Sequence, residues 1–166
     1  MNAETFTKSN TATLFSEASL TTILEGLAQG RVHVKAVDLY FRAVAALPNN
    51  GQRTSWEKIP HISLHPPAGY SGTQALSGIG YAEQQKELVL SIGQYFGIAN
   101  EHGIFFEDHY ADCALELTYN DFAKLIPDFI NMPGHKYFVA KNGRWLVNVT
   151  MEDDVYFTEK ITLQMP

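Results

Sequence analysis

The segment that decides the fold lies at residues 137–157 and reads YFVAKNGRWLVNVTMEDDVYF. Apolar and aromatic residues dominate Tyr137 to Ala140 and Arg144 to Val149. Between them stands Asn142-Gly143, the dipeptide that a type I′ hairpin turn prefers. A third apolar run, Val155 to Phe157, follows the acidic residues after the second run. The segment therefore predicts a three-strand antiparallel meander.

Upstream of this meander the hydrophobic period changes between that of helices and that of strands. Helical spacing predicts helices over 20–27 and 37–47, joined as a hairpin, then over 81–100, and over 122–130 with a break at Pro127. Period-two stretches predict strands at 104–106 and 113–117, and one short strand is expected in the proline- and glycine-rich connection over 48–80. The order lacks the regular strand-helix alternation of a parallel sheet. It predicts an α+β fold with N-terminal helices packed on an antiparallel sheet.

The composition is that of one globular domain spanning residues 1–166, with 45% hydrophobic side chains and a single cysteine, Cys113. Residues 1–13 are polar and are expected to form a flexible tail without the apolar core of a signal peptide. A cytoplasmic location is therefore expected. Separately, no stretch approaches the roughly 18 apolar residues of a membrane span. The lone cysteine excludes an internal disulfide and any zinc site that uses two cysteines of this chain.

The charge of the chain is concentrated in one segment. The formal net charge is −6, which disfavours direct binding to nucleic acid or to an anionic membrane and favours a basic protein partner. Residues 1–99 and 131–166 are each neutral, whereas residues 100–130 hold seven acidic side chains against Lys124 alone. Aromatic residues lie between these acids, as in interfaces where rings are anchors and carboxylates steer the partner. The predicted partner-binding residues of this segment and of the later acidic run are Glu101, Phe106, Glu107, Asp108, Tyr110, Asp112, Glu116, Asp121, Glu152, Asp153 and Asp154.

One cluster inside the same segment offers an alternative function. His102, Glu107, His109 and Asp112 supply the ligand types of a zinc or iron site, which would suit a small-molecule enzyme or a metalloprotein. The segment has no HExxH motif, no paired CxxC motif and no glycine-bracketed calcium loop. Cys113 alternates with leucines and is predicted to lie on an apolar strand face. The leading interpretation therefore includes no catalytic residue, no metal and no cofactor.

In general character the chain resembles the small cytoplasmic immunity proteins that bacteria make against toxins of contact-dependent and related polymorphic systems. The resemblance is carried by the short acidic α+β chain, the segment EHGIFFEDHYADCALEL at residues 101–117, and the closing meander. It implies a non-enzymatic binding protein that masks the active site of a cognate basic toxin, such as a nuclease domain. These families share no catalytic motif, so no residue role is transferred. An obligate homo-oligomer is a third hypothesis, and the oligomeric state is left open.

Overall fold

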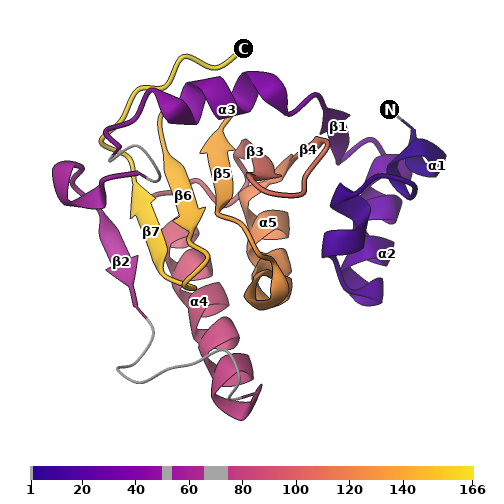
Figure 1. Cartoon of the computed structure of the whole chain (residues 1–166), viewed down its shortest axis with the longest axis horizontal. Coiled ribbons are helices and arrows are strands. Elements are labelled where there is room, and N and C mark those ends of the chain that lie inside the picture. The colour runs from indigo at the N-terminus through magenta and orange to yellow at the C-terminus, as the bar shows by residue number, and fades with distance from the viewer. Residues whose placement is uncertain (1, 50–53, 66–74) are drawn as a thin grey trace.

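The computed structural model describes residues 2–49, 54–65 and 75–166, which place helices on both faces of one seven-stranded sheet (Figure 1). The helices are α1 (Ala3–Phe6), η1 (Thr11–Leu14), α2 (Glu17–Ala28), α3 (Asp38–Ala45), η2 (Trp56–Lys58), α4 (Ala75–Tyr95), α5 (Tyr119–Leu125) and η3 (Ile126–Asn131), where η denotes a 3₁₀ helix. The strands are β1 (His33–Lys35), β2 (Ile62–Leu64), β3 (His102–Glu107), β4 (Ala114–Thr118), β5 (Lys136–Ala140), β6 (Leu146–Val149) and β7 (Val155–Thr158). The predicted α+β class with an antiparallel sheet is confirmed.

Neighbouring strands of this sheet are all antiparallel and follow the order β1-β4-β3-β5-β6-β7-β2. The predicted meander is β5-β6-β7, and Val139 lies opposite Leu146 in its first hairpin. The turn differs from the predicted one, because Gly143 has a positive φ of 72° and Asn142 does not. The Gly143 amide donates to the Ala140 carbonyl at 2.8 Å. The connection is therefore a longer loop, built on a type I turn that ends at a left-handed glycine.

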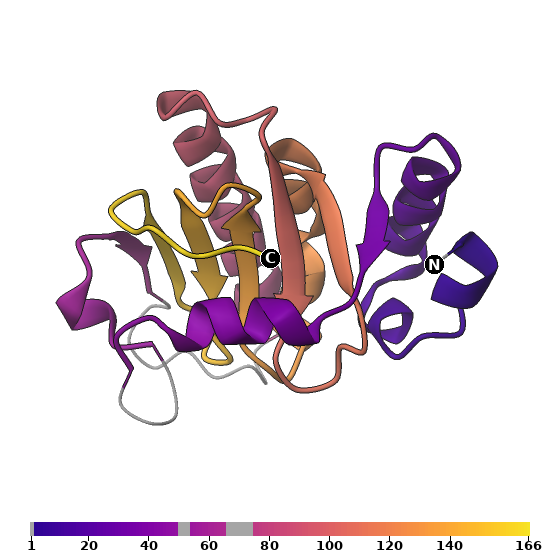
Figure 2. The same ribbon diagram turned by 90° about the horizontal axis from the view of Figure 1, so that it is seen from above.

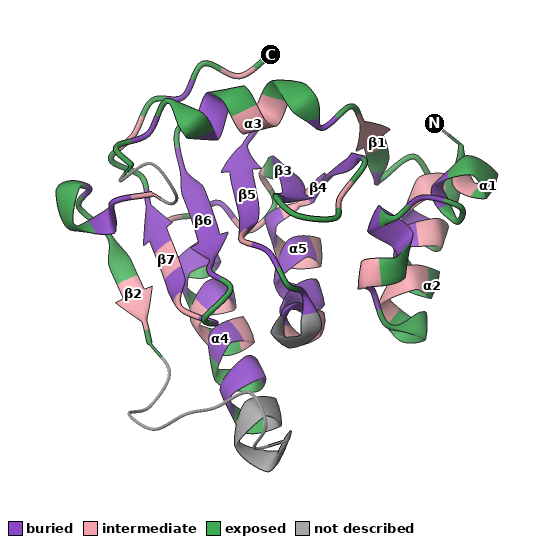
Figure 3. Cartoon of the chain, viewed as in Figure 1, coloured by how far each residue is buried: buried purple, intermediate pink, exposed green. Residues whose placement is uncertain are grey.

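Both faces of the sheet are covered, so the central strands are buried along their length rather than at alternate residues (Figure 3). Figure 2 shows α4 and α5 on one face and α3 on the other. On the first face Phe138 stacks on Phe122 of α5, with ring centroids 4.1 Å apart. On the second face Phe106 contacts Phe41 of α3 edge-on at 5.4 Å. This double coverage buries polar side chains of the strands together with the apolar ones.

The first part of the chain departs from the prediction in two ways. The helices expected over 20–27 and 37–47 do not form a hairpin, because β1 lies between them and pairs with β4 at the sheet edge. α2 packs into the core that contains Phe105, whereas α3 packs into the opposite core that contains Phe106. The expected tail over 1–13 instead forms α1 and η1, with Phe6 completely buried. Phe6 and Ala12 anchor this otherwise polar segment in the core, which its composition does not reveal.

Other local predictions are confirmed. α5 ends at Leu125 and the chain continues as the 3₁₀ helix η3, so the break expected at Pro127 is present. The short strand expected in the 48–80 connection is β2, although residues 50–53 and 66–74 of that connection lie outside the described residues. Within the described part of the chain, no helix has both the length and the apolar character needed to cross a membrane.

Candidate protein-binding surface

The register of the sheet gives it two ends of different chemistry. At one end Glu107 of β3 lies opposite Lys136 of β5, close to the turn at 150–154 that joins β6 to β7. We call this the Glu107 end. At the other, the His102 end, His102 of β3 lies opposite Thr118 of β4. The predicted partner-binding residues divide between the two ends, with Glu101, Glu116 and Asp121 toward the His102 end and the others toward the Glu107 end.

Acidic side chains toward the His102 end are neutralised within the protein. Glu116 is buried, and its carboxylate contacts the ammonium groups of Lys141 at 2.8 Å and Lys35 at 3.0 Å. Burial by itself would raise the pKa of Glu116, but the two lysines outweigh it and lower that pKa. The other two acids are bound similarly, Glu101 by Arg144 and the Trp145 indole N–H, and Asp121 by Lys124 and Arg31. Their negative charges are therefore largely neutralised by lysine and arginine residues of the same chain.

Several predicted contact residues lie inside the protein. Phe106 is 0% exposed and packs among the rings of α3 and β5. Glu107 is also 0% exposed, and its Oε2 atom accepts hydrogen bonds from the amides of Tyr110 and Ala111 at 2.6 and 3.1 Å. Glu107 therefore shapes the loop at 108–113 and does not present its charge to a partner. The prediction is corrected for the residues whose side chains are buried, which are Phe106, Glu107, Glu116 and Asp153.

The buried Lys136 ammonium lies between the acidic segments 107–108 and 152–154. Carboxylates of both segments act on it, those of Asp153 and Glu107 most strongly. Burial lowers the pKa of Lys136 to about 8, and the carboxylates oppose this shift. Burial likewise raises the pKa of Asp153 to about 6, and Lys136 opposes that shift. The fold thus brings together two acidic segments that are far apart in the sequence. They lie near the Lys136 ammonium, and no sequence motif predicted a role for this lysine.

Asp112 attaches the N-terminal segment to the 108–113 loop. Its carboxylate accepts hydrogen bonds from the amides of Asn10 and Thr11 at 2.9 and 3.1 Å. In return, the Thr11 hydroxyl oxygen accepts hydrogen bonds from the amides of Asp112 and Cys113, each at 3.1 Å. Burial would raise the pKa of Asp112, but the hydrogen bonds outweigh it and lower that pKa. This exposed carboxylate therefore also has a structural role.

The exposed part of the Glu107 end combines acids with two apolar side chains. Tyr110 and Met151 are 54% and 57% exposed, and Figure 2 shows their two loops projecting from the same end of the sheet. His135 joins the loops, since its amide donates to Asp108 at 2.7 Å and its Nδ1 atom accepts from the Met151 amide at 3.4 Å. We define the acidic loop surface as Asp108, Tyr110, Asp112, Met151, Glu152 and Asp154.

The carboxylates of this surface differ from those of the His102 end in their partners. Among the described residues, Asp108, Asp112 and Asp154 form no ion pair with a lysine or arginine. Asp108 and Asp112 accept hydrogen bonds from backbone amides, and Asp154 contacts His65 at 3.1 Å. The charges of these three carboxylates are therefore not neutralised by a lysine or arginine of the described chain.

A small cavity of about 150 Å³ adjoins this surface on the α3 side of the sheet. Trp56 and Tyr156 form part of its wall, with ring centroids 4.8 Å apart and planes 5° apart. The Trp56 indole N–H donates to Asn148 at 3.1 Å. The remaining described lining residues are Thr54, Glu57, His135, Thr150 and Asp154. Met151, His135 and this ring pair carry no sequence motif that marks them as functional. The one usable signal is the position of Met151 beside the acidic run 152–154.

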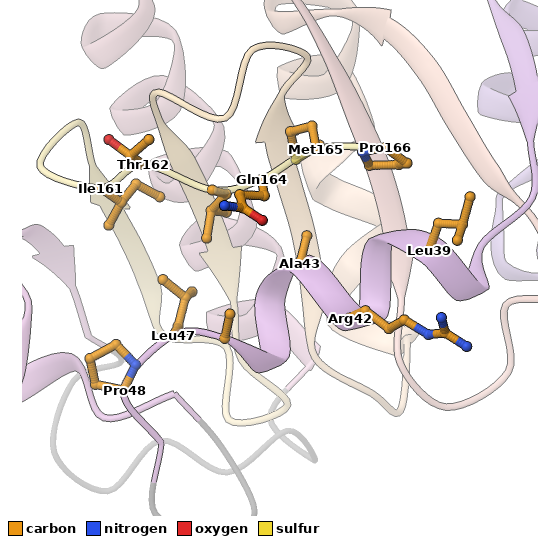
Figure 4. Close-up of a pocket in the computed structure, with 12 residues that line it drawn as sticks. Leu39, Arg42, Ala43, Leu47, Pro48, Ile161, Thr162, Gln164, Met165 and Pro166 are labelled. Carbon is orange, nitrogen blue, oxygen red and sulfur yellow. The ribbon is translucent and has the colours of Figure 1, made fainter.

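A larger groove of about 710 Å³ lies between α3 and the segment 161–166 (Figure 4). Its described lining includes exposed apolar residues such as Leu39 and one charged residue, Arg42. Because that charge is positive, the groove does not extend the acidic loop surface.

The alternative cluster of His102, Glu107, His109 and Asp112 does not converge. His102 and Glu107 are the two ends of β3, roughly 17 Å apart at about 3.3 Å per residue. In the part of the chain that the structure describes, no three His, Cys, Asp or Glu side chains gather as a metal site requires. Cys113 is 1% exposed and burial raises the pKa of its thiol, as in an inert core cysteine.

No protein-family model matches the chain, and no curated protein or solved structure matches it. Residue roles are therefore not transferred from a relative, and function is inferred from the chemistry of the Glu107 end. There, the 108–113 and 150–154 loops carry exposed carboxylates and two exposed apolar side chains, Tyr110 and Met151.

Proposed function

We propose that the chain is a non-enzymatic acidic binding protein, an immunity protein or inhibitor, which masks the active site of a cognate basic toxin in the cytoplasm. The observation that carries the proposal is the contrast between the two ends of the sheet. Carboxylates toward the His102 end are paired with lysine or arginine, whereas Asp108, Asp112 and Asp154 are held by amides, a hydroxyl and a histidine. Carboxylates that no lysine or arginine neutralises attract a basic protein and speed its association.

The apolar side chains of the acidic loop surface supply the second requirement of an interface. Binding energy is concentrated in a few well-buried anchors, and a polar rim surrounds them. Tyr110 and Met151 are exposed among the acids in this arrangement. Their loops are also fixed before binding, by Glu107 beneath one loop and by His135 between the two. A preformed surface loses less conformational entropy when a partner binds.

The charge can be tested with the product of a toxin-like reading frame adjacent to the gene of this chain. We expect Glu152→Lys to reduce the association rate about tenfold at low salt and to weaken its salt dependence. The matched control is Glu25→Lys on the exposed face of α2, for which we expect a change of less than about twofold. Association kinetics measured over a series of salt concentrations provide the readout. Identical kinetics for Glu152→Lys and the wild type would contradict the proposal.

The apolar anchor is tested independently of charge. We expect Tyr110→Ala to weaken binding about 30-fold, the usual cost of truncating an aromatic anchor. Tyr95→Ala is its matched control, because Tyr95 is 84% exposed but lies on α4. The same two variants can be compared for protection of cells that express the toxin. Equal protection by both would show that the contact lies elsewhere.

A further inference from the structure

We propose that the 150 Å³ cavity beside Asp154 is a slot for one arginine side chain of the partner. The inference rests on the proposed function and deepens it, because Asp154 belongs both to the cavity and to the acidic loop surface. It assigns the class of side chain that the partner must place there.

The charge of the lining selects a cation. Glu57 and Asp154 contribute carboxylates, and none of the described lining residues is a lysine or arginine. The Asp154 side chain is 23% exposed, so water screens its charge less than that of a fully exposed acid. Its Oδ1 atom contacts His65 at 3.1 Å and its Oδ2 atom accepts from the Tyr156 hydroxyl at 3.5 Å. Each carboxylate oxygen has a further lone pair for another donor. A guanidinium group can donate several N–H hydrogen bonds to these carboxylate oxygens.

The size and walls of the cavity select a side chain rather than a cofactor. Pockets for small molecules of drug or cofactor size occupy about 300–1,000 Å³, well above the 150 Å³ found here. The rings of Trp56 and Tyr156 offer apolar surface to a methylene stem, while the carboxylates receive its charged head. Arginine fits better than lysine, because its planar fork bonds two acceptors at once and lies well against aromatic surfaces.

Hydrogen bonds hold this wall in place. The Trp56 indole donates to Asn148, and the Asn148 side-chain amide in turn donates to the Lys136 carbonyl at 3.0 Å. On the other side, the Thr150 amide donates to the Asp154 carbonyl at 2.8 Å, and the Asp154 amide donates to the Thr150 hydroxyl oxygen at 3.2 Å. The ring wall and the carboxylate are thereby positioned relative to the strands before a ligand enters.

The slot can be tested on the isolated full chain by NMR, with N-acetyl-L-arginine N-methylamide as the probe. We expect a saturable shift of the Trp56 indole N–H resonance, with a dissociation constant on the order of 1–10 mM. The chain has one other tryptophan, Trp145, whose indole binds Glu101 toward the His102 end and whose resonance should not move. We expect the neutral citrulline analogue to cause no saturable shift and the lysine analogue to bind at least about fivefold more weakly.

Two substitutions connect the shift to the carboxylates. Asp154→Asn should weaken probe binding about tenfold, and Glu57→Gln, on an exposed residue that does not threaten folding, about two- to fivefold. The absence of a saturable Trp56 shift, or equal affinity for the citrulline or lysine analogue, would overturn the assignment. Because the probe needs no partner, failure of the slot leaves toxin binding through Tyr110 and Glu152 intact. If instead the chain does not bind the toxin, N-acetyl-L-arginine N-methylamide should still bind the slot.

Discussion

Glu107 and Lys136 lie opposite each other on β3 and β5, and neither side chain reaches solvent. The Lys136 ammonium donates to the Met132 carbonyl at 2.8 Å. Loop amides bind one oxygen of Glu107, and within the described residues its Oε1 atom has no hydrogen-bond partner. Lys136 is also the cation that faces Asp153, so removing the lysine leaves carboxylates in the interior without their compensating charge.

Replacing the lysine tests this dependence. Lys136→Met should lower the free energy of unfolding by about 3–5 kcal/mol, because Glu107 and Asp153 then lose their shared cation. The double variant Lys136→Met with Glu107→Gln should recover part of that loss. Urea unfolding of the wild type, both single variants and the double variant gives the coupling energy. Strictly additive effects would show that the two residues do not compensate each other.

Gly134 is tightly enclosed by the carboxylates of Glu107 and Asp108. A Cβ atom at this position would lie 1.7 Å from Glu107 Oε1 and 2.6 Å from Asp108 Oδ1. Gly134→Ala should therefore destabilise the protein by about 1–3 kcal/mol, measured by thermal or urea unfolding. Gly80→Ala is the control, since its Cβ would meet nothing within 4 Å in α4, and it should raise stability by about 0.5–1 kcal/mol. Unchanged stability of Gly134→Ala would mean that Glu107 moves aside freely.

Asp153 predicts a dependence of stability on pH. Its pKa is raised to about 6 by burial, so the folded chain binds this proton more tightly than the unfolded chain does. The contribution of Asp153 to the free energy of unfolding therefore falls as pH rises from about 4 to 6. Asp153→Asn keeps a residue type that tolerates the φ of 66° and should remove this dependence. The stability difference between wild type and variant, measured by urea unfolding at several pH values, should change between pH 4 and 6 and level off above 7.

Asp112→Ala should release the N-terminal segment selectively. The substitution removes the acceptor of the Asn10 and Thr11 amides and should cost about 2 kcal/mol. Hydrogen exchange should accelerate over residues 3–14, while the amides of β5 and β6 keep their protection. Uniform acceleration across the sheet would instead indicate that this segment and the sheet unfold as one unit.

The local parts of the fold were readable from the sequence because their signals are local. The β5-β6 hairpin follows from two apolar runs around a glycine turn, and the break after α5 follows from Pro127. The positions of the acidic residues in space could not be predicted from the charge pattern alone, because they also depend on the directions of the strands. Glu101 and Glu107 are six residues apart, but β3 carries them to opposite ends of the sheet. Their final neighbours, Arg144 and Lys136, come from distant segments that no short-range pattern connects to them.

The strand order also constrains how the chain matures as it is synthesised. The two earliest strands, β1 and β2, occupy the outer edges of the sheet, and their partners β4 and β7 are made much later. Pairing across such long sequence separations is slow. During synthesis, β1 and β2 stay unpaired in this sheet until β4 and β7 have been made. Trp56 precedes β2 and Tyr156 lies on β7, so the stacked pair forms only when synthesis has passed the last strand. The proposed arginine slot is therefore complete only after β7 has been synthesised and paired.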